Sequence, residues 1–164
     1  MRVLYFLSAW GSGLCLIAMT LLILAQIIAR MLGIIIPSSE DFAGWLLSAT
    51  LFFGLAYTFN TGGHIRLTIL LSRLSDKYRK ISEIVALFVG LLIVSYFFYY
   101  STYTVYESYD FEDVSDTYLP VPLWIVQLPM ALGSLALFLS FIESFILLLF
   151  GKKPSYLTVE QEEI

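Results

Sequence analysis

Few residues of this chain have side chains that could carry out chemistry in an active site. The sequence holds one cysteine, Cys15, and one histidine, His64. A single thiol excludes an internal disulfide and a thiol-relay pair. A single imidazole excludes bis-histidine haem ligation and multi-histidine metal sites. Because no catalytic dyad, phosphate-binding loop or metal-ligand spacing is found either, we expect no enzyme activity and no cofactor in this chain.

Polar side chains inside the apolar parts of the sequence are also few. Gln26 and Gln127 are the two amides expected to be buried there, and we expect them to form interhelical hydrogen bonds. Glu143 lies close to the end of the last apolar run, where we expect it to pair with nearby bases. A transporter that works alone needs ionisable groups near the membrane midplane. Their scarcity indicates a protein that supports chemistry carried out by another subunit.

Four long apolar runs must position these residues. They cover 4–36, 42–59, 81–104 and 120–150, and each is long enough for a helix that crosses a hydrocarbon core of about 30 Å. Hydrophobic residues make up 59% of the chain and charged residues only 13%, about half the usual charged share of a soluble domain. The sequence therefore predicts a single all-α integral membrane domain, 1–164, with four transmembrane helices.

The basic residues other than Arg30 are all placed so that they fall on one side of such a fold: Arg2, Arg66, Arg73, Lys77, Arg79, Lys80, Lys152 and Lys153. The two remaining connections carry acids: Glu40, Asp41, Glu107, Asp110, Glu112, Asp113 and Asp116. Lys and Arg favour the cytoplasmic side, so we expect a multi-pass protein of the bacterial inner membrane with both termini in the cytoplasm. No basic surface is rich enough to bind nucleic acid. The acidic outer loop is either simply solvated or a docking site for a binding protein.

Two cytoplasmic segments complete the expected organisation. Residues 65–80 place leucines at i, i+3, i+4 and i+7 and keep most of their charges off that stripe. Such a basic amphipathic helix is predicted to lie on the inner leaflet, against anionic membrane lipid. Residues 151–164 form a C-terminal tail.

The first apolar run is longer than a membrane span requires. Its helix must tilt strongly, project beyond the membrane or break near Gly33. Arg30 is then expected at the outer interface, followed by an apolar segment, 31–36. This segment is either buried at the interface within the subunit or in contact with another protein.

Pro37 ends that segment, and the two serines after it favour the start of the second helix. Glu40 and Asp41 follow in its first turn, where acids interact favourably with the helix dipole. Helix capping by itself is one explanation for these two acids. The alternative is a salt bridge to Arg30 or to a partner. Pro129, inside the last run, predicts a kink.

The middle of the chain resembles a known family. The stretch FGLAY at 53–57, then GGHIRL at 62–67 with Leu70 and Leu71, resembles the small membrane subunit of tripartite ATP-independent periplasmic (TRAP) transporters, the DctQ-like family. Further positions that agree are Arg30, Glu40, Asp41, Trp45, Pro120, Pro122, Trp124 and Pro129. Thr68 departs from the family, which often has an acid there.

The resemblance implies a sodium-driven importer of an organic acid, such as a C4-dicarboxylate or a sialic acid. It implies an obligate large membrane subunit that binds substrate and sodium, a periplasmic substrate-binding protein, and a fixed scaffold role for this chain. Gly62, Gly63, His64 and Arg66 then form either a tight turn with ordinary cytoplasmic charge or a contact with lipid or the large subunit. The candidate interface or structural residues are Gln26, Arg30, Glu40, Asp41, Trp45, Gly62, Gly63, His64, Arg66, Trp124, Gln127 and Pro129.

Two other functions fit a four-helix membrane protein. A small multidrug-type exporter needs a membrane-embedded carboxylate in its first helix, but residues 4–36 contain no acid. An accessory subunit of another inner-membrane complex, for example one in quinone chemistry, would need haem-binding histidines or cysteine pairs. The sequence therefore favours the transporter subunit over both alternatives.

Overall fold

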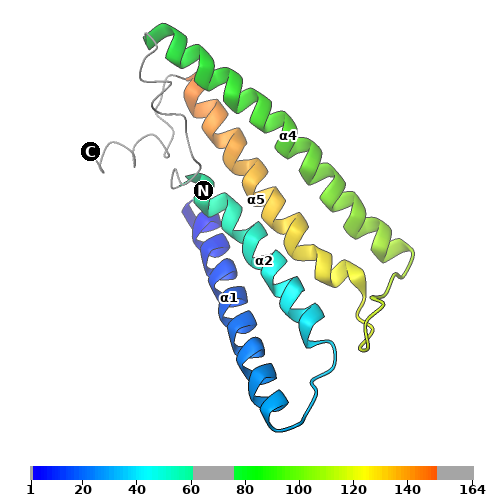
Figure 1. Ribbon diagram of the computed structural model, residues 1–164. Helices are drawn as coiled ribbons and strands as arrows, with labels where there is room; N and C mark the ends of the chain where they lie inside the picture. Colours follow the sequence, from blue (N-terminus) through cyan, green and yellow to red (C-terminus); the bar gives the residue numbers. More distant parts are fainter. Residues whose placement is uncertain (1, 61–75, 151–164) are drawn as a thin grey trace.

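The computed structural model describes residues 2–60 and 76–150. They form four helices: α1 (Arg2–Met31), α2 (Ser39–Asn60), α4 (Asp76–Asp110) and α5 (Leu123–Leu149) (Figure 1). Each contains a segment long and apolar enough to cross a membrane. The predicted all-α membrane fold is therefore confirmed. The predicted interfacial helix and the C-terminal tail lie outside the described residues, apart from positions 76–80, which belong to α4.

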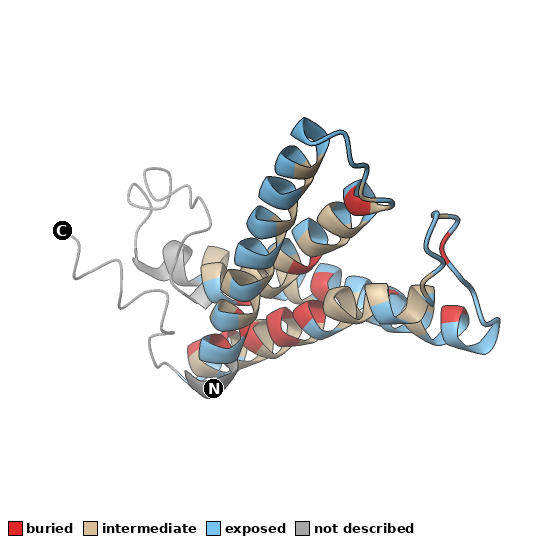
Figure 2. Cartoon of the chain, turned by 90° about the horizontal axis from the view of Figure 1, so that it is seen from below, coloured by how far each residue is buried: buried red, intermediate tan, exposed pale blue. Residues whose placement is uncertain are grey.

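The helices form a row whose order differs from their order in the chain. α1 packs against α2, α2 against α5 and α5 against α4, while α1 meets α5 at only a few positions. α1 and α4 therefore lie at the two edges of the row, and α2 and α5 lie in its middle (Figure 1). Buried residues are most frequent on α5, while most of α1 is exposed (Figure 2).

Small residues allow the close packing of α5. Its buried positions include Gly133, Ser134, Ala136, Ser140 and Ser144. A Cβ atom added at Gly133 would lie 2.5 Å from the backbone carbonyl of Phe52, so α2 and α5 approach each other backbone to backbone at this position. Without a hydrophobic effect between helices in lipid, such van der Waals packing at small residues is a principal source of association.

Aromatic rings fill the spaces on both sides of α5. Phe59 of α2 stacks on Phe141 of α5 with ring centroids 4.1 Å apart. Phe98 of α4 stacks on Phe138 of α5 at 5.5 Å. Gly90 of α4 leaves room for the Phe141 ring, which would lie 2.5 Å from an added Cβ. The core of the row is thus built from rings set against small residues.

The first helix ends at Met31, so the long apolar run breaks near Gly33, one of the three outcomes expected from the sequence. The amide of Ile34 donates to the carbonyl of Ala29 at 2.9 Å, and that of Gly33 donates to the carbonyl of Arg30 at 3.1 Å. Gly33 has a positive φ of 74°. These features make a Schellman motif, in which glycine adopts the left-handed conformation without the strain that a Cβ atom causes.

The two connections at this end of the row contact each other. Ser38 has a φ of 55°, and its hydroxyl oxygen accepts a hydrogen bond from the amide of Leu119 at 3.1 Å. The hydroxyl of Ser39 donates to the carbonyl of Ile36 at 3.0 Å. α4 continues to Asp110, beyond the predicted run, which ends at 104. The loop that follows is closed by an antiparallel bridge between Val114 and Pro122.

Candidate functional site

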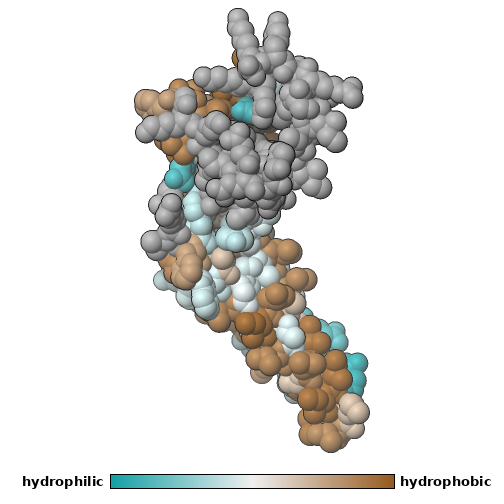
Figure 3. All heavy atoms as spheres, turned by 90° about the vertical axis from the view of Figure 1, so that its left-hand side faces the viewer, coloured by the Kyte–Doolittle hydropathy of each residue, from teal (hydrophilic) through white to brown (hydrophobic). Residues whose placement is uncertain are grey.

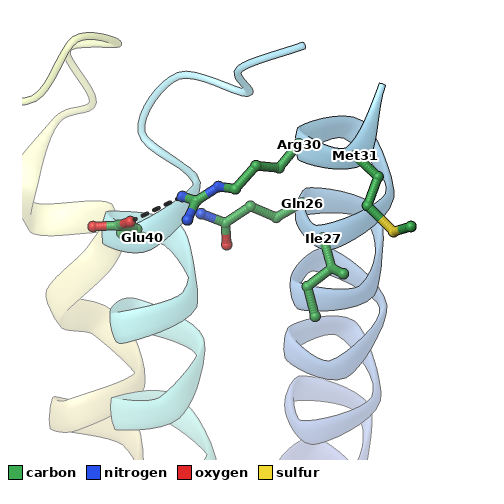
Figure 4. Close-up of a pocket in the computed structure, with 5 residues that line it drawn as sticks. All are labelled: Gln26, Ile27, Arg30, Met31 and Glu40. Carbon is green, nitrogen blue, oxygen red and sulfur yellow. Dashed lines mark ion pairs between the residues drawn. The ribbon is translucent and has the colours of Figure 1, made fainter. Parts of the chain in front are cut away.

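Arg30 and Glu40 meet at the end of the row where α1 passes into α2. Arg30 lies in the last turn of α1 and Glu40 in the first turn of α2. A cation at a helix C-terminus and an anion at a helix N-terminus both interact favourably with the helix dipoles. The short connection returns the chain beside itself, and the Arg30 Nη2 and Glu40 Oε1 atoms lie 3.8 Å apart (Figure 4).

This ion pair is exposed rather than buried. The Arg30 and Glu40 side chains retain 74% and 82% of their accessible surface. An exposed pair of this kind contributes only about 0–1 kcal/mol to stability. The pair therefore does little to hold α1 against α2 in the isolated chain.

A cleft of about 410 Å³ surrounds the pair, lined by Gln26, Ile27, Arg30, Met31 and Glu40. Gln26 and Arg30 both extend from α1 toward α2, so the polar groups face the gap between the helices (Figure 4). Of the predicted site residues, the structure thus brings Gln26, Arg30 and Glu40 together. Their arrangement offers donors, acceptors and apolar edges for a binding partner.

Asp41 and Trp45 lie in the first turns of α2 and follow Glu40, which lines this cleft, in the sequence. The Asp41 side chain is exposed, and that of Trp45 is half-buried. Trp45 meets the ring of Phe42 edge to face, with centroids 4.8 Å apart. Trp45 therefore has a packing role within α2, whereas Asp41 adds a further negative charge to the α2 end.

The other predicted residues in the last helix lie near its start. Trp124 meets the ring of Tyr109 edge to face at 5.8 Å, which joins the end of α4 to the start of α5. The Oε1 atom of Gln127 is buried and has no hydrogen-bond partner within the described part of the chain. The sequence predicted an interhelical hydrogen bond for Gln127, and its Oε1 atom forms none among the described residues. Pro129 lies inside α5 and removes one helical hydrogen-bond donor there.

The remaining predicted residues, Gly62, Gly63, His64 and Arg66, lie outside the described residues. Among the residues that are described, no group of three or more His, Cys, Asp or Glu side chains could hold a metal ion.

Sequence reasoning missed one polar contact, at the opposite end of α1. The Tyr5 hydroxyl donates a hydrogen bond to Oε2 of Glu143 at 2.6 Å. Tyr5 is buried and Glu143 is half-buried. The sequence predicted basic partners for this carboxylate, and the side chains of those bases lie outside the described part of the structure. The structure adds a phenol from α1. One signal was available in the sequence. A fold with an even number of membrane spans has the start of α1 and the end of α5 on the same side of the membrane.

Comparison with known proteins agrees with this architecture. Residues 19–151, most of the chain, match the family described as tripartite ATP-independent periplasmic transporters, DctQ component. No curated protein matches the chain. The family consists of transporter components rather than enzymes, and a tripartite system implies a large membrane subunit and a binding protein as partners. With four membrane-spanning helices and a family match over most of its length, the chain belongs to the DctQ family and is a small membrane subunit of a TRAP transporter.

Proposed function

We propose that this chain is the fixed scaffold of a sodium-driven importer of an organic acid, such as a C4-dicarboxylate or a sialic acid. A large membrane subunit binds the substrate and sodium and moves them across the membrane. A periplasmic binding protein delivers the substrate. This chain forms an obligate complex with the large subunit and itself binds neither sodium nor a cofactor.

The placement of ionisable side chains is the observation that carries the proposal. In the described spans, acids and bases lie toward the helix ends, as Arg30, Glu40, Glu107 and Glu143 do. Glu143 is engaged by the Tyr5 hydroxyl. Transport of an ion or a carboxylate through a subunit needs polar groups that converge near the midplane. Their arrangement here favours a supporting role beside a subunit that carries them.

The packing of the inner helices also supports a fixed role. Gly133 lies so close to the Phe52 backbone that a residue with a Cβ atom at this place would clash, so a shift of α5 that brought such a residue there is disfavoured. Ser134 and Ser140 are fully buried in the same helix. Closely packed interiors resist continuous deformation. A subunit that supports a moving partner needs this property.

We also propose that the chain lies in the bacterial inner membrane with both termini in the cytoplasm. The hydrogen bond between Ser38 and Leu119 joins the two acidic connections at one end of the row. The basic segments follow the opposite ends of α2 and α5. The positive-inside rule then assigns the joined connections to the periplasmic side.

Reconstitution tests the division of labour. Proteoliposomes that contain both membrane subunits, with binding protein and substrate outside, should take up substrate when a sodium gradient is applied. Vesicles with this chain alone should take up none, and vesicles without it should lose uptake. A matched control has equal sodium on both sides. Uptake by this chain alone, or undiminished uptake in its absence, contradicts the proposal.

Cysteine labelling tests the orientation separately. In a Cys15→Ser background, an impermeant thiol reagent added to spheroplasts should label a cysteine at Glu112, which is exposed in the described structure. A cysteine at Lys153 should react only after the membrane is permeabilised. Labelling of the Lys153 position in intact spheroplasts would reverse the assignment.

A further inference from the structure

We infer that the cleft between the end of α1 and the start of α2 binds one phospholipid whose headgroup carries both a phosphate and a primary ammonium group. The cleft has a volume of about 410 Å³ and is lined by Gln26, Ile27, Arg30, Met31 and Glu40 (Figure 4). The binding itself follows from the cleft and from the membrane-spanning fold. Only its assignment to the outer leaflet rests on the orientation proposed above.

The polar groups of the cleft are ordered by depth along α1. Arg30 lies in the last turn of this helix, at the end of the membrane span. Gln26 lies four residues earlier, which places it about 6 Å deeper at 1.5 Å per helical residue. Full charges therefore lie at the membrane surface, and an amide lies one turn below them. A glycerophospholipid has the same order, with the charged headgroup outermost, then the ester carbonyls and then the acyl chains.

The charges at the rim of the cleft specify the headgroup. Arg30 and Glu40 lie 3.8 Å apart, and both side chains are largely exposed, so each can accept a further partner. A guanidinium group binds a phosphate through two parallel hydrogen bonds. The carboxylate of Glu40, with that of Asp41 next to it in the first turn of α2, suits an ammonium group that donates hydrogen bonds. Two acids beside one base disfavour a headgroup with a net negative charge.

Gln26 gives the cleft a polar group below its charged rim. Its half-buried side chain extends from α1 toward α2 (Figure 4). Within the described part of the chain it forms no hydrogen bond, so the interhelical bond expected from the sequence is not found there. An amide without a partner is unfavourable in apolar surroundings. The ester carbonyl of a bound lipid would accept a hydrogen bond from the Gln26 amide group at this depth.

The position of the cleft favours lipid over protein as the occupant. Among the described residues only α1 and α2 line it, and α1 is an edge helix of the row. The α1 side of the molecule is largely hydrophobic toward this end, as acyl chains beside the cleft require (Figure 3). A soluble binding protein cannot reach Gln26, which lies within the span. Lipid surrounds the span at a concentration that no protein reaches, so even a weak preference fills the site.

Site-specific photo-crosslinking in membranes identifies the occupant. p-Benzoyl-phenylalanine replaces Ile27, which lines the cleft, or Ile28, which lies at nearly the same depth outside it. The two side chains are 51% and 59% exposed, so the control is matched. Both membrane subunits and the binding protein are co-expressed. Position 27 should give lipid adducts in which the ethanolamine headgroup is enriched about threefold or more relative to position 28, since one added hydrogen bond has an effect of this size.

Other occupants would appear in the same experiment. An adduct of position 27 with the large subunit, with the binding protein or with a second copy of this chain overturns the inference. Adducts of the same lipid composition at positions 27 and 28 overturn it as well.

The headgroup selectivity of the purified full chain supplies a second readout. In an equal mixture of three lipids, native mass spectrometry should show binding of phosphatidylethanolamine before phosphatidylcholine and phosphatidylglycerol. Choline has no N–H group to donate, and the glycerol headgroup leaves a net negative charge. Glu40→Gln should lower the ratio of bound phosphatidylethanolamine to phosphatidylglycerol by about threefold or more, because it removes a charge-assisted hydrogen bond. Glu107→Gln, at an exposed acid of α4, is the matched control and should leave the ratio unchanged.

Arg30→Gln should give a different result, which a purely structural role would not produce. It should weaken the binding of all three lipids alike, because each of them carries a phosphate. Both Arg30 and Glu40 are exposed, so the variants should keep the wild-type helix content. A wild-type chain without headgroup preference, or equal effects of Glu40→Gln and Glu107→Gln, contradicts the lipid site. Either result leaves the proposed transport function standing, since these binding measurements involve no transport.

Discussion

Two polar contacts at opposite ends of α1 differ in nearly every physical respect. Arg30 and Glu40 carry full opposite charges, yet they are 3.8 Å apart and largely exposed. Tyr5 and Glu143 form a single hydrogen bond of 2.6 Å, with the phenol buried between helices. The comparison teaches that charge alone does not set the strength of a contact, because solvent screens the first and packing excludes solvent from the second.

The same comparison separates stability from recognition. The Tyr5–Glu143 bond links the edge helix α1 to the inner helix α5, which otherwise meet at few positions. It therefore helps to fix the row. The Arg30–Glu40 pair is solvated, so a binding partner can replace the water around it. The pair then contributes to the free energy of association, favourably or unfavourably, only when that partner covers it.

The largest effect expected in the isolated chain concerns the buried contact. Tyr5→Phe removes the donor and leaves the Glu143 carboxylate without the hydrogen bond seen in the structure. We expect the free energy of unfolding of the purified subunit to fall by about 1.5–3 kcal/mol, measured by thermal or denaturant unfolding in detergent. Tyr106→Phe, at an exposed tyrosine of α4, is the control and should change it by less than about 0.5 kcal/mol. Equal effects in the two variants would remove the contrast.

Double-mutant cycles sharpen the comparison. Tyr5→Phe combined with Glu143→Ala should show a coupling energy of about 0.5–3 kcal/mol, because the two groups share one interaction. Arg30→Ala combined with Glu40→Ala should show less than about 0.5 kcal/mol in the isolated chain, because the pair is exposed. The measurement is the same unfolding assay. A larger coupling for the ion pair would reverse our ranking of the two contacts.

The smallest effect in the isolated chain is expected from Arg30→Ala. It should lower the free energy of unfolding by about 0–1 kcal/mol, and 1 M salt should abolish even this difference, since charges are then screened within about 3 Å. In the complex the same change should matter more, up to about 3–5 kcal/mol if the pair becomes fully buried.

The measurement for the complex is the yield of large subunit that co-purifies, with uptake selectivity as a second readout that should stay constant. Replacing Glu40 and Asp41 together should resemble Arg30→Ala, and the combined variant should be less than additive. Small, strictly additive effects in the complex would mean that the acids only cap α2 and that Arg30 only reaches to the interface.

Much of the fold could be predicted because the relevant forces act over short stretches of chain. Four apolar runs are each long enough to cross a bilayer, whatever their neighbours are. The break at Gly33 follows from the freedom of glycine to adopt a positive φ. The meeting of Arg30 and Glu40 was expected as one alternative because a short connection keeps the two helix ends close. The family was also readable, since the most specific part of the resemblance, 53–71, is one local stretch of sequence.

Three features could not be predicted from the sequence: the order of the helices in the row, the Gly133–Phe52 contact and the Tyr5–Glu143 bond. Tyr5 and Glu143 are 138 positions apart, and many tyrosines of this chain could have reached a carboxylate near a helix end. Which one does so depends on how α1, α2 and α5 pack, and in lipid that choice is made by shape at small residues rather than by hydropathy. The sequence by itself determined the four spans and the sorting of charge. Only the tertiary structure decided which faces meet, because hydropathy is nearly uniform along these helices while steric fit is not.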